Sequence, residues 1–134
     1  MRLVVLDTNV IVSAGIGSGA PSRIVNEILE GTVQIALSPS VIDEYQRVVT
    51  YARFRKWDFP PTWVEALITL GLRLDEPEAW PDEGPDPEDV KFLAIAHRAG
   101  AWLVTGNEKH FPPRIRRGVA ILSPRNYVEW LERR

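Results

Sequence analysis

The stretch "LVVLDTNV", residues 3–10, contains the pattern that decides the fold. Its first four residues are all apolar, which is typical of a strand buried on both faces of a sheet. Asp7 follows at the point where this strand is expected to end. A carboxylate at the rim of a core needs a partner, because an unpaired charge is costly to bury.

Strand and helix patterns alternate through the rest of the chain. Besides residues 3–6, we predict strands at "TVQIAL" (32–37), "AWLVT" (101–105) and "VAIL" (119–122). Helices are predicted over residues 22–29, 38–50, 60–71, 86–100 and 123–133, with Ser38, Asp86 and Ser123 as N-caps and Gly31 and Gly100 as stop signals. The proline-rich acidic stretch 75–87 is predicted to be a loop. This alternation implies an α/β fold with a mostly parallel sheet covered on both faces.

Length and composition narrow the class of protein. The 134 residues, 45% of them hydrophobic and 25% charged, fit one globular domain over residues 1–134. The absence of cysteine excludes disulfides and thiol chemistry. No apolar run approaches the roughly 20 residues of a membrane span, and the N-terminus lacks a signal-peptide layout. We therefore expect a cytoplasmic protein with no membrane partner.

Charge is unevenly distributed along the chain. Eight of the 18 acidic residues lie between residues 75 and 89. A basic patch with interleaved aromatic residues occupies the stretch around residue 50, comprising Arg47, Arg53, Arg55 and Lys56. Such a patch suits contact with RNA phosphates and bases. A solvated helix face with its aromatic residues turned inward explains the same pattern, so both interpretations stay open.

Three carboxylates are candidates for a common site. Ligands of open parallel sheets bind beyond the carboxyl ends of the strands, which is where Asp7 and the segment Thr105-Gly106-Asn107 are expected. Glu44 falls on the flank of the apolar stripe of its helix and needs a partner. Asp89 shares a stripe with core-facing residues of the next helix, whereas Lys91 and Arg98 mark the other side.

Each of these acids also has a purely structural interpretation. Asp7 can cap a helix that begins at Thr8, and Glu44 can lie on a solvated flank. Asp89 can complete a capping box with Asp86, for which the cap role is favoured. If the three acids converge, a hard cation such as Mg²⁺ or Mn²⁺ neutralises them through oxygen ligands. His97 and His110 receive no catalytic role, because metal-activated water needs no histidine base.

Four stretches together resemble the PIN-domain family, in particular small bacterial proteins related to the VapC toxins of toxin–antitoxin systems. They are "VVLDTNVIVSA", "LSPSVIDEYQRVV", "DPEDVKFLAIAHRAGAWLVTGNEKHFP" and "ILSPRNYVEWL". The resemblance implies a three-layer α/β/α sandwich and a Mg²⁺- or Mn²⁺-dependent endoribonuclease. In that reaction, metal-activated water attacks an RNA phosphodiester and leaves a 5′-phosphate and a 3′-hydroxyl. It also implies a homodimer and an antitoxin protein that covers the site.

The resemblance assigns roles residue by residue. Asp7, Glu44 and Asp89 match the family's catalytic, metal-binding acids. Thr8, Asn9 and Thr105 match polar positions that surround the metal site. Asp86 and Glu108 do not match the motif but are candidates to compensate for a fourth acid that this chain lacks.

Asn107 departs from the family pattern, because many PIN domains carry a fourth aspartate there. Its amide oxygen can still bind a metal but adds no charge, so a second metal is expected to bind more weakly. This departure favours one alternative function, a weak or inactive PIN domain that binds RNA or protein.

Two other classes fit less well. A haloacid-dehalogenase-like phosphatase needs a second aspartate where this chain has Asn9. A receiver domain needs an acid pair after its first strand and an aspartate after its third, and neither feature is evident in this chain.

Overall fold

The strands of the computed structural model form one parallel sheet. Within the described residues, 2–51 and 62–134, five strands pair in the order β3-β2-β1-β4-β5. Their bounds are β1 (Arg2–Leu6), β2 (Val33–Leu37), β3 (Leu72–Arg73), β4 (Trp102–Val104) and β5 (Ile121–Leu122). All four pairings are parallel. The predicted strand at 3–6 is therefore central, and its residues Val4, Val5 and Leu6 are fully buried.

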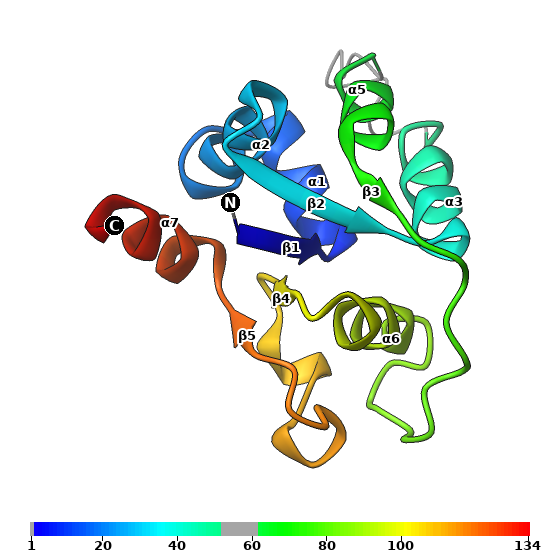
Figure 1. Cartoon of the computed structure of the whole chain (residues 1–134). Coiled ribbons are helices and arrows are strands. Elements are labelled where there is room, and N and C mark those ends of the chain that lie inside the picture. The colour runs from blue at the N-terminus through cyan, green and yellow to red at the C-terminus, as the bar shows by residue number, and fades with distance from the viewer. Residues whose placement is uncertain (1, 52–61) are drawn as a thin grey trace.

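Helices cover both faces of this sheet (Figure 1). They are α1 (Thr8–Ile16), α2 (Ala20–Glu30), α3 (Pro39–Val48), α5 (Thr62–Leu70), α6 (Val90–Ala99) and α7 (Pro124–Arg133). On one side α2 packs against β2, α1 and α7, and on the other α6 packs against β1, β2 and β4. The predicted three-layer α/β/α sandwich is confirmed. Within the described residues, no helix has the length and apolar character needed to cross a bilayer.

Local sequence signals explain several helix ends. Ser38 and Ser123 act as N-caps, because their hydroxyls accept hydrogen bonds from the backbone N–H groups of Val41 and Asn126. Gly31 and Gly100 end α2 and α6 in the left-handed conformation that glycine adopts without steric cost. These four predictions are confirmed.

The predicted start of α6 at Asp86 is wrong. The Asp86 side chain instead accepts a hydrogen bond from the backbone N–H of Glu88 at 3.0 Å and closes a turn. Such a local bond competes with helix capping. The helix begins only at Val90, with Asp89 in the N-cap position. Asp89 is therefore not the third residue of a capping box.

One helix, one strand and two 3₁₀ turns were not predicted, and one helix is only partly described. The helix α1 was considered only as the segment that Asp7 would cap, and β3, with two residues, is too short to show a periodicity. The structure describes α5 from Thr62, so its predicted start at residue 60 or 61 lies outside the described residues. Its predicted end near Gly71 is confirmed.

The strand order reverses between β1 and β4, which places their carboxyl ends side by side. The chain proceeds from β1 outward to β2 and β3, then crosses back to β4 on the other side of β1. The backbone N–H of Asp7 donates to the carbonyl of Val104 at 3.0 Å. Crevices at such a reversal are where open parallel sheets bind ligands.

Candidate active site

Asp7 occupies the bottom of this crevice. Only 4% of the residue is exposed, and Thr105 Oγ1, which is fully buried, donates to its Oδ2 at 2.8 Å. Asp7 stands in the N-cap position of α1, and the backbone N–H of Asn9 lowers the pKa of its carboxyl group. Because the carboxylate also accepts from Thr105 and lines the crevice, a helix cap alone does not account for it.

Burial raises the pKa of Asp7 from an ordinary 3.8 to about 6. The hydrogen bond from Thr105 lowers this pKa, while the charges of Asp89 and Glu44 raise it further. The three carboxyl groups therefore act on one another electrostatically, although they come from β1, α3 and the start of α6.

The free energy of unfolding of the metal-free protein is expected to fall as the pH rises through the titration of Asp7. The folded-state pKa is raised, so the stabilising contribution is complete below 3.8 and is lost as the pH passes about 6. At about 1.4 kcal/mol per pH unit, the loss amounts to about 3 kcal/mol. Urea denaturation in EDTA between about pH 4 and pH 7 measures it. The Asp7→Asn variant should lack this component, and the same pH dependence in both proteins would contradict the assignment.

Glu44 reaches the crevice from α3, and the residue after it anchors that helix. Tyr45 is fully buried, and its hydroxyl donates to the carbonyl oxygen of Leu6, the last residue of β1. Because Leu6 precedes Asp7, this hydrogen bond brings the second turn of α3 to the end of β1. The neighbouring side chain, Glu44, is thereby held beside Asp7.

Replacing Tyr45 with phenylalanine is expected to lower the free energy of unfolding by about 1–2 kcal/mol, because the Leu6 carbonyl loses a buried hydrogen bond. The Tyr45→Leu variant also loses packing and should cost more. Urea denaturation of both variants measures the difference. If Tyr45→Phe is as stable as the wild type, the hydroxyl does not hold α3.

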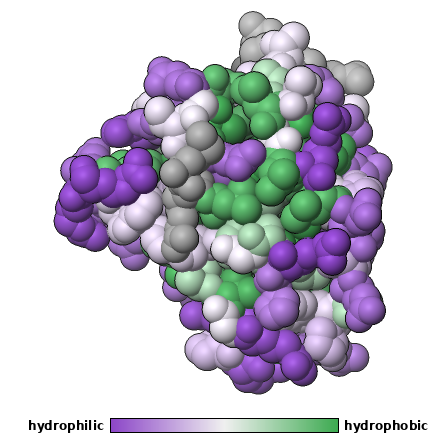
Figure 2. All heavy atoms as spheres, viewed as in Figure 1, coloured by the Kyte–Doolittle hydropathy of each residue, from purple (hydrophilic) through white to green (hydrophobic). Residues whose placement is uncertain are grey.

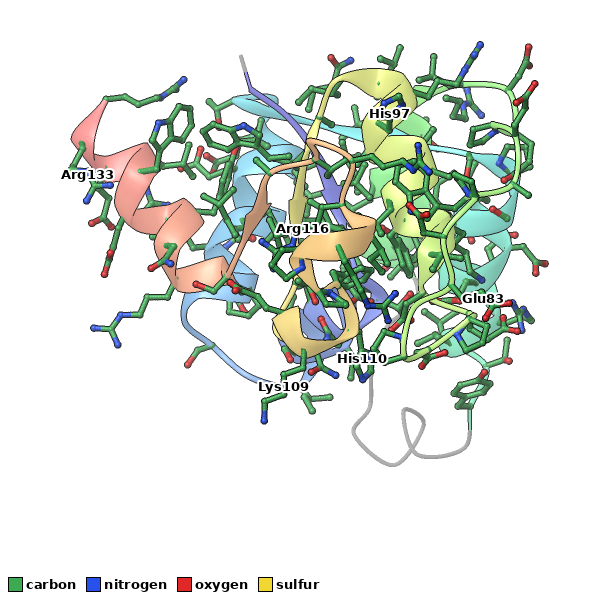
Figure 3. The ribbon with its side chains drawn as sticks, turned by 90° about the horizontal axis from the view of Figure 1, so that it is seen from below. Glu83, His97, Lys109, His110, Arg116 and Arg133 are labelled. Carbon is green, nitrogen blue, oxygen red and sulfur yellow. The ribbon has the colours of Figure 1, made fainter. Side chains whose placement is uncertain are left out.

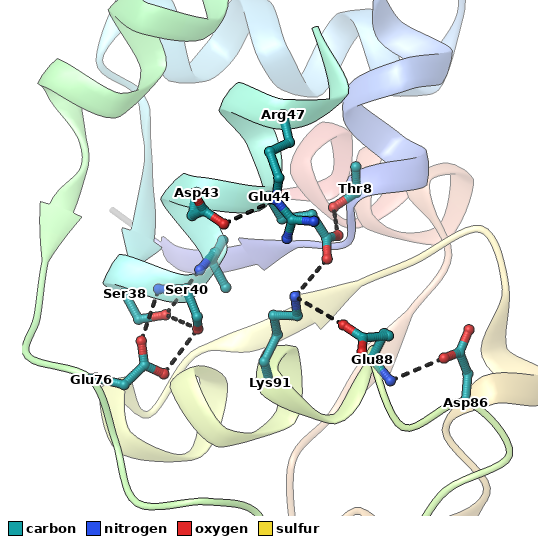
Figure 4. A network of polar contacts seen from close by, with 11 residues as sticks. Thr8, Ser38, Ser40, Asp43, Glu44, Arg47, Glu76, Asp86, Glu88 and Lys91 are labelled. Carbon is teal, nitrogen blue, oxygen red and sulfur yellow. Dashed lines mark hydrogen bonds and ion pairs between the residues drawn. The ribbon is translucent and has the colours of Figure 1, made fainter. Parts of the chain in front are cut away.

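Both carboxylate oxygens of Glu44 already have protein partners (Figure 4). Thr8 Oγ1 donates to Oε2, and Lys91 Nζ lies 2.6 Å from Oε1. The Glu44 and Lys91 side chains are only 17% and 16% exposed. Glu44 is thus half-buried and paired, as its position predicts, and the solvated-flank alternative is wrong. The placement of Lys91 on the other, solvent side of α6 is also wrong, because its flexible stem reaches across to α3.

Asp89 faces the same crevice from the N-terminus of α6. His110 Nδ1 lies 2.5 Å from its Oδ2. Burial raises the pKa of Asp89, the hydrogen bond with His110 lowers it, and the charge of Asp86 raises it. His110 belongs to the 3₁₀ turn η1 (Glu108–His110), which follows β4.

These side chains line a cleft of about 360 Å³. It gathers seven of the residues predicted for the site: Asp7, Thr8, Asn9, Glu44, Asp86, Asp89 and Asn107. Thr105, the eighth, lies behind Asp7. Asn9 Oδ1 accepts from the backbone N–H of Gly106 at 3.3 Å, which joins the start of α1 to the loop after β4.

The PIN domain family matches residues 3–109. The chain belongs to this family. The matched segment contains all eight predicted site residues, and we refer to the cleft that they form as the PIN cleft. No curated protein matched the chain.

Solved structures share the PIN fold at low sequence identity. VapBC2 from Rickettsia felis, bound to a promoter DNA fragment, matches with a TM-score of 0.61 and 16% identity, covering 91% of this chain and 98% of that one. DNA-bound VapBC from Salmonella typhimurium matches with a TM-score of 0.61 and 19% identity, covering 92% of this chain and 99% of that one. FitAcB from Neisseria gonorrhoeae matches with a TM-score of 0.58 and 20% identity, covering 90% of this chain and 97% of that one. At these identities the likeness concerns the fold.

The donor set of the PIN cleft fits a hard divalent cation. Carboxylate and amide oxygens are the ligands that Mg²⁺ and Mn²⁺ prefer. Asp7 is buried with its pKa raised, beside two further acids that raise it more. A bound cation would relieve this repulsion.

Two residues at this site were missed from the sequence. Lys91 contacts Glu44 and His110 contacts Asp89, each across a long separation in sequence. Lys91 carried no signal, because helical periodicity places it toward solvent. His110 carried a weak one, since it lies three residues after Asn107 in "TGNEKHF".

The predicted basic patch is only partly described. Arg47 is exposed and pairs with Asp43 at 2.9 Å on the surface of α3. Arg53, Arg55 and Lys56 lie outside the described residues.

Proposed function

We propose that this PIN domain is a metal-dependent endoribonuclease that hydrolyses RNA phosphodiester bonds in the cytoplasm. The observation that carries the proposal is the acidic cleft at the reversal of strand order. There Asp7, Glu44 and Asp89 converge from three different elements. Burying several carboxylates in one cleft is expensive unless a cation joins them.

Asp7, Glu44 and Asp89 would hold Mg²⁺ or Mn²⁺, with Asn107 as a neutral oxygen ligand in the same cleft. A bound ion of this kind lowers the pKa of water and polarises a phosphodiester. The protein orients the acids: Thr105 holds Asp7 by a hydrogen bond, and Thr8 fixes one oxygen of Glu44. Asn9 and Asp86 complete the polar lining.

Arg47 is the described candidate for contact with the RNA backbone. It is exposed on α3 one turn after Glu44, and its side chain pairs with Asp43 (Figure 4). An arginine there can pair with a phosphate that approaches the cleft. The proposed contribution of Arg53, Arg55 and Lys56 rests on the sequence alone.

We also propose that the protein acts as the toxin of a toxin–antitoxin pair, as a homodimer silenced by an antitoxin. The sequence resembles VapC toxins, and the similar solved structures are VapBC and FitAcB assemblies. An apolar surface supports self-association. Figure 2 shows hydrophobic side chains gathered on the face that carries α5 and β3, where Leu70 and Leu72 are 52% and 37% exposed. Exposed apolar patches commonly mark protein interfaces.

Metal removal is expected to abolish cleavage. The purified protein should cut RNA with Mn²⁺ or Mg²⁺, lose activity in EDTA, and recover when the metal is added in excess. Product ends should be 5′-phosphate and 3′-hydroxyl, read by end-labelling. Undiminished cleavage in EDTA would overturn the proposed metal-dependent chemistry.

The toxin role has its own test. Expression in bacteria should arrest growth, and co-expression of a small gene neighbouring this one should relieve the arrest. Normal growth on expression of a protein that cleaves RNA in vitro would indicate a housekeeping nuclease.

Asn107 favours a second candidate, a PIN domain that binds RNA or protein without cutting. RNA affinity without cleavage at saturating Mn²⁺ would decide for this alternative.

A further inference from the structure

His110 lies within the acidic cleft, although the metal chemistry assigned to the other residues does not use it. Figure 3 labels it at the edge of the molecule beside Lys109. Its side chain is 34% exposed, and its Nδ1 lies 2.5 Å from Asp89 Oδ2. Among the described residues, potential ligand atoms of Asp86, Asp89 and His110 all lie within 4.8 Å of one another.

This spacing is close to that of ligands around one ion. Metal–ligand bonds of about 2.1 Å separate neighbouring ligand atoms by about 3 Å and opposite ones by about 4.2 Å. The 4.8 Å limit for the three residues is slightly wider than this range, so a bound ion would have to draw the ligand atoms into place. In the metal-free protein, Asp89 and His110 share a hydrogen bond where a cation could lie between them.

Asn107 contacts the same imidazole. Its Nδ2 lies 2.9 Å from His110 Nε2 and 3.3 Å from Nδ1, so the shorter contact is to the nitrogen that does not face Asp89. When Nδ1 carries the proton and donates it to Asp89, Nε2 accepts a hydrogen bond from the Asn107 carboxamide. If Nδ1 bound a cation, Nε2 would carry the proton, and the carboxamide could rotate to accept it through its oxygen. An asparagine serves both arrangements because it donates and accepts, whereas an ionised aspartate only accepts.

We propose that His110 supplies a nitrogen ligand for a divalent cation held with Asp86 and Asp89, and that Asn107 orients the imidazole. This assignment rests on the proposed metal-dependent function. It gives His110 the ligand role that was predicted for Asn107. Histidine ligands are commonly oriented by a hydrogen bond to their second nitrogen. Imidazole suits first-row transition ions better than Mg²⁺, so the site should favour Mn²⁺.

Pulsed EPR of the Mn²⁺-loaded protein tests the ligand directly. The wild type should show ¹⁴N coupling from a bound imidazole, and His110→Gln should lose it. His97→Gln is the matched control, because His97 is the other of the chain's two histidines and packs edge-on against Trp80 on another surface. This control variant should keep the coupling.

Calorimetric titration adds an affinity test. The His110→Gln variant should bind Mn²⁺ at least about tenfold more weakly, with a smaller loss for Mg²⁺. Asn107→Ala should keep the ¹⁴N coupling but bind Mn²⁺ about tenfold more weakly, as expected for a positioning residue. Circular dichroism establishes that each variant is folded.

The outcomes separate this proposal from the proposed function. Mn²⁺ binding without ¹⁴N coupling in the wild type, or with coupling retained in folded His110→Gln, overturns the ligand role of His110 alone. A wild-type protein that binds no Mn²⁺ or Mg²⁺ overturns the metal-dependent function as well.

Discussion

Asp7→Asn is expected to reduce Mn²⁺-dependent RNA cleavage by about a thousandfold or more while leaving the protein folded. Asp7 is the most deeply buried of the three acids and lies at the junction of β1 and β4. Asparagine retains the shape and can still accept from Thr105, but it removes the charge that would hold the cation. Losses of about 10²–10⁴ are typical when a group with a direct role in the reaction is removed.

The same variant should be more stable than the wild type in EDTA above about pH 6, because it no longer buries a carboxylate whose pKa is about 6. Adding Mn²⁺ should raise the melting temperature of the wild type and leave that of Asp7→Asn nearly unchanged. Asp75→Asn is the matched control, since Asp75 is exposed after β3 and does not line the cleft. Wild-type cleavage rates in Asp7→Asn would contradict the site.

Lys91→Met is expected to lower the free energy of unfolding by about 2 kcal/mol and to strengthen Mn²⁺ binding. The substitution leaves the half-buried Glu44 without its cation, and the cost of a lone buried charge exceeds the value of an exposed pair. The site also becomes more negative by one charge, which favours a divalent ion by about threefold or more. Without metal, the variant should therefore be less stable than the wild type. Added Mn²⁺ should stabilise the variant more than it stabilises the wild type.

A double-mutant cycle with Glu44→Gln tests the pairing. The Glu44→Gln/Lys91→Met protein should recover most of the lost stability, because neither charge remains. Lys109→Met is the control, since Lys109 is exposed on the turn after β4. If Lys91→Met and Lys109→Met unfold at the same urea concentration, the Lys91–Glu44 pair contributes nothing measurable. Weaker Mn²⁺ binding by folded Lys91→Met would indicate that Lys91 only positions Glu44.

Patterns along the sequence were sufficient to predict most helices and strands, and the edge of the sheet at which Asp7 and Thr105 meet. An apolar run followed by a polar residue marks a buried parallel strand and its carboxyl end, and Ser38 and Gly100 mark helix ends through local chemistry. The flank position of Glu44 follows from helical geometry. These signals depend on neighbouring residues, so a single sequence contains them.

The pairings within the site could not be predicted in the same way. Lys91 reaches Glu44 and His110 reaches Asp89 only because α6, α3 and η1 are brought together by the order of the strands. The turn that Asp86 closes competes with helix capping, and the sequence favours both. Lys91 therefore looked solvated, although it is a partner of the second acid.

The pairing of β4 with β1 also fixes when the cleft can exist during synthesis. A chain ending before residue 101 already contains Asp7, Glu44 and Asp89, but it lacks Val104 and Thr105, which hold the backbone and side chain of Asp7. Without β4, Asp7 lacks the two contacts that hold it at the edge of the sheet. We therefore expect the acidic cleft to be completed late in folding, when the second half of the sheet has joined the first.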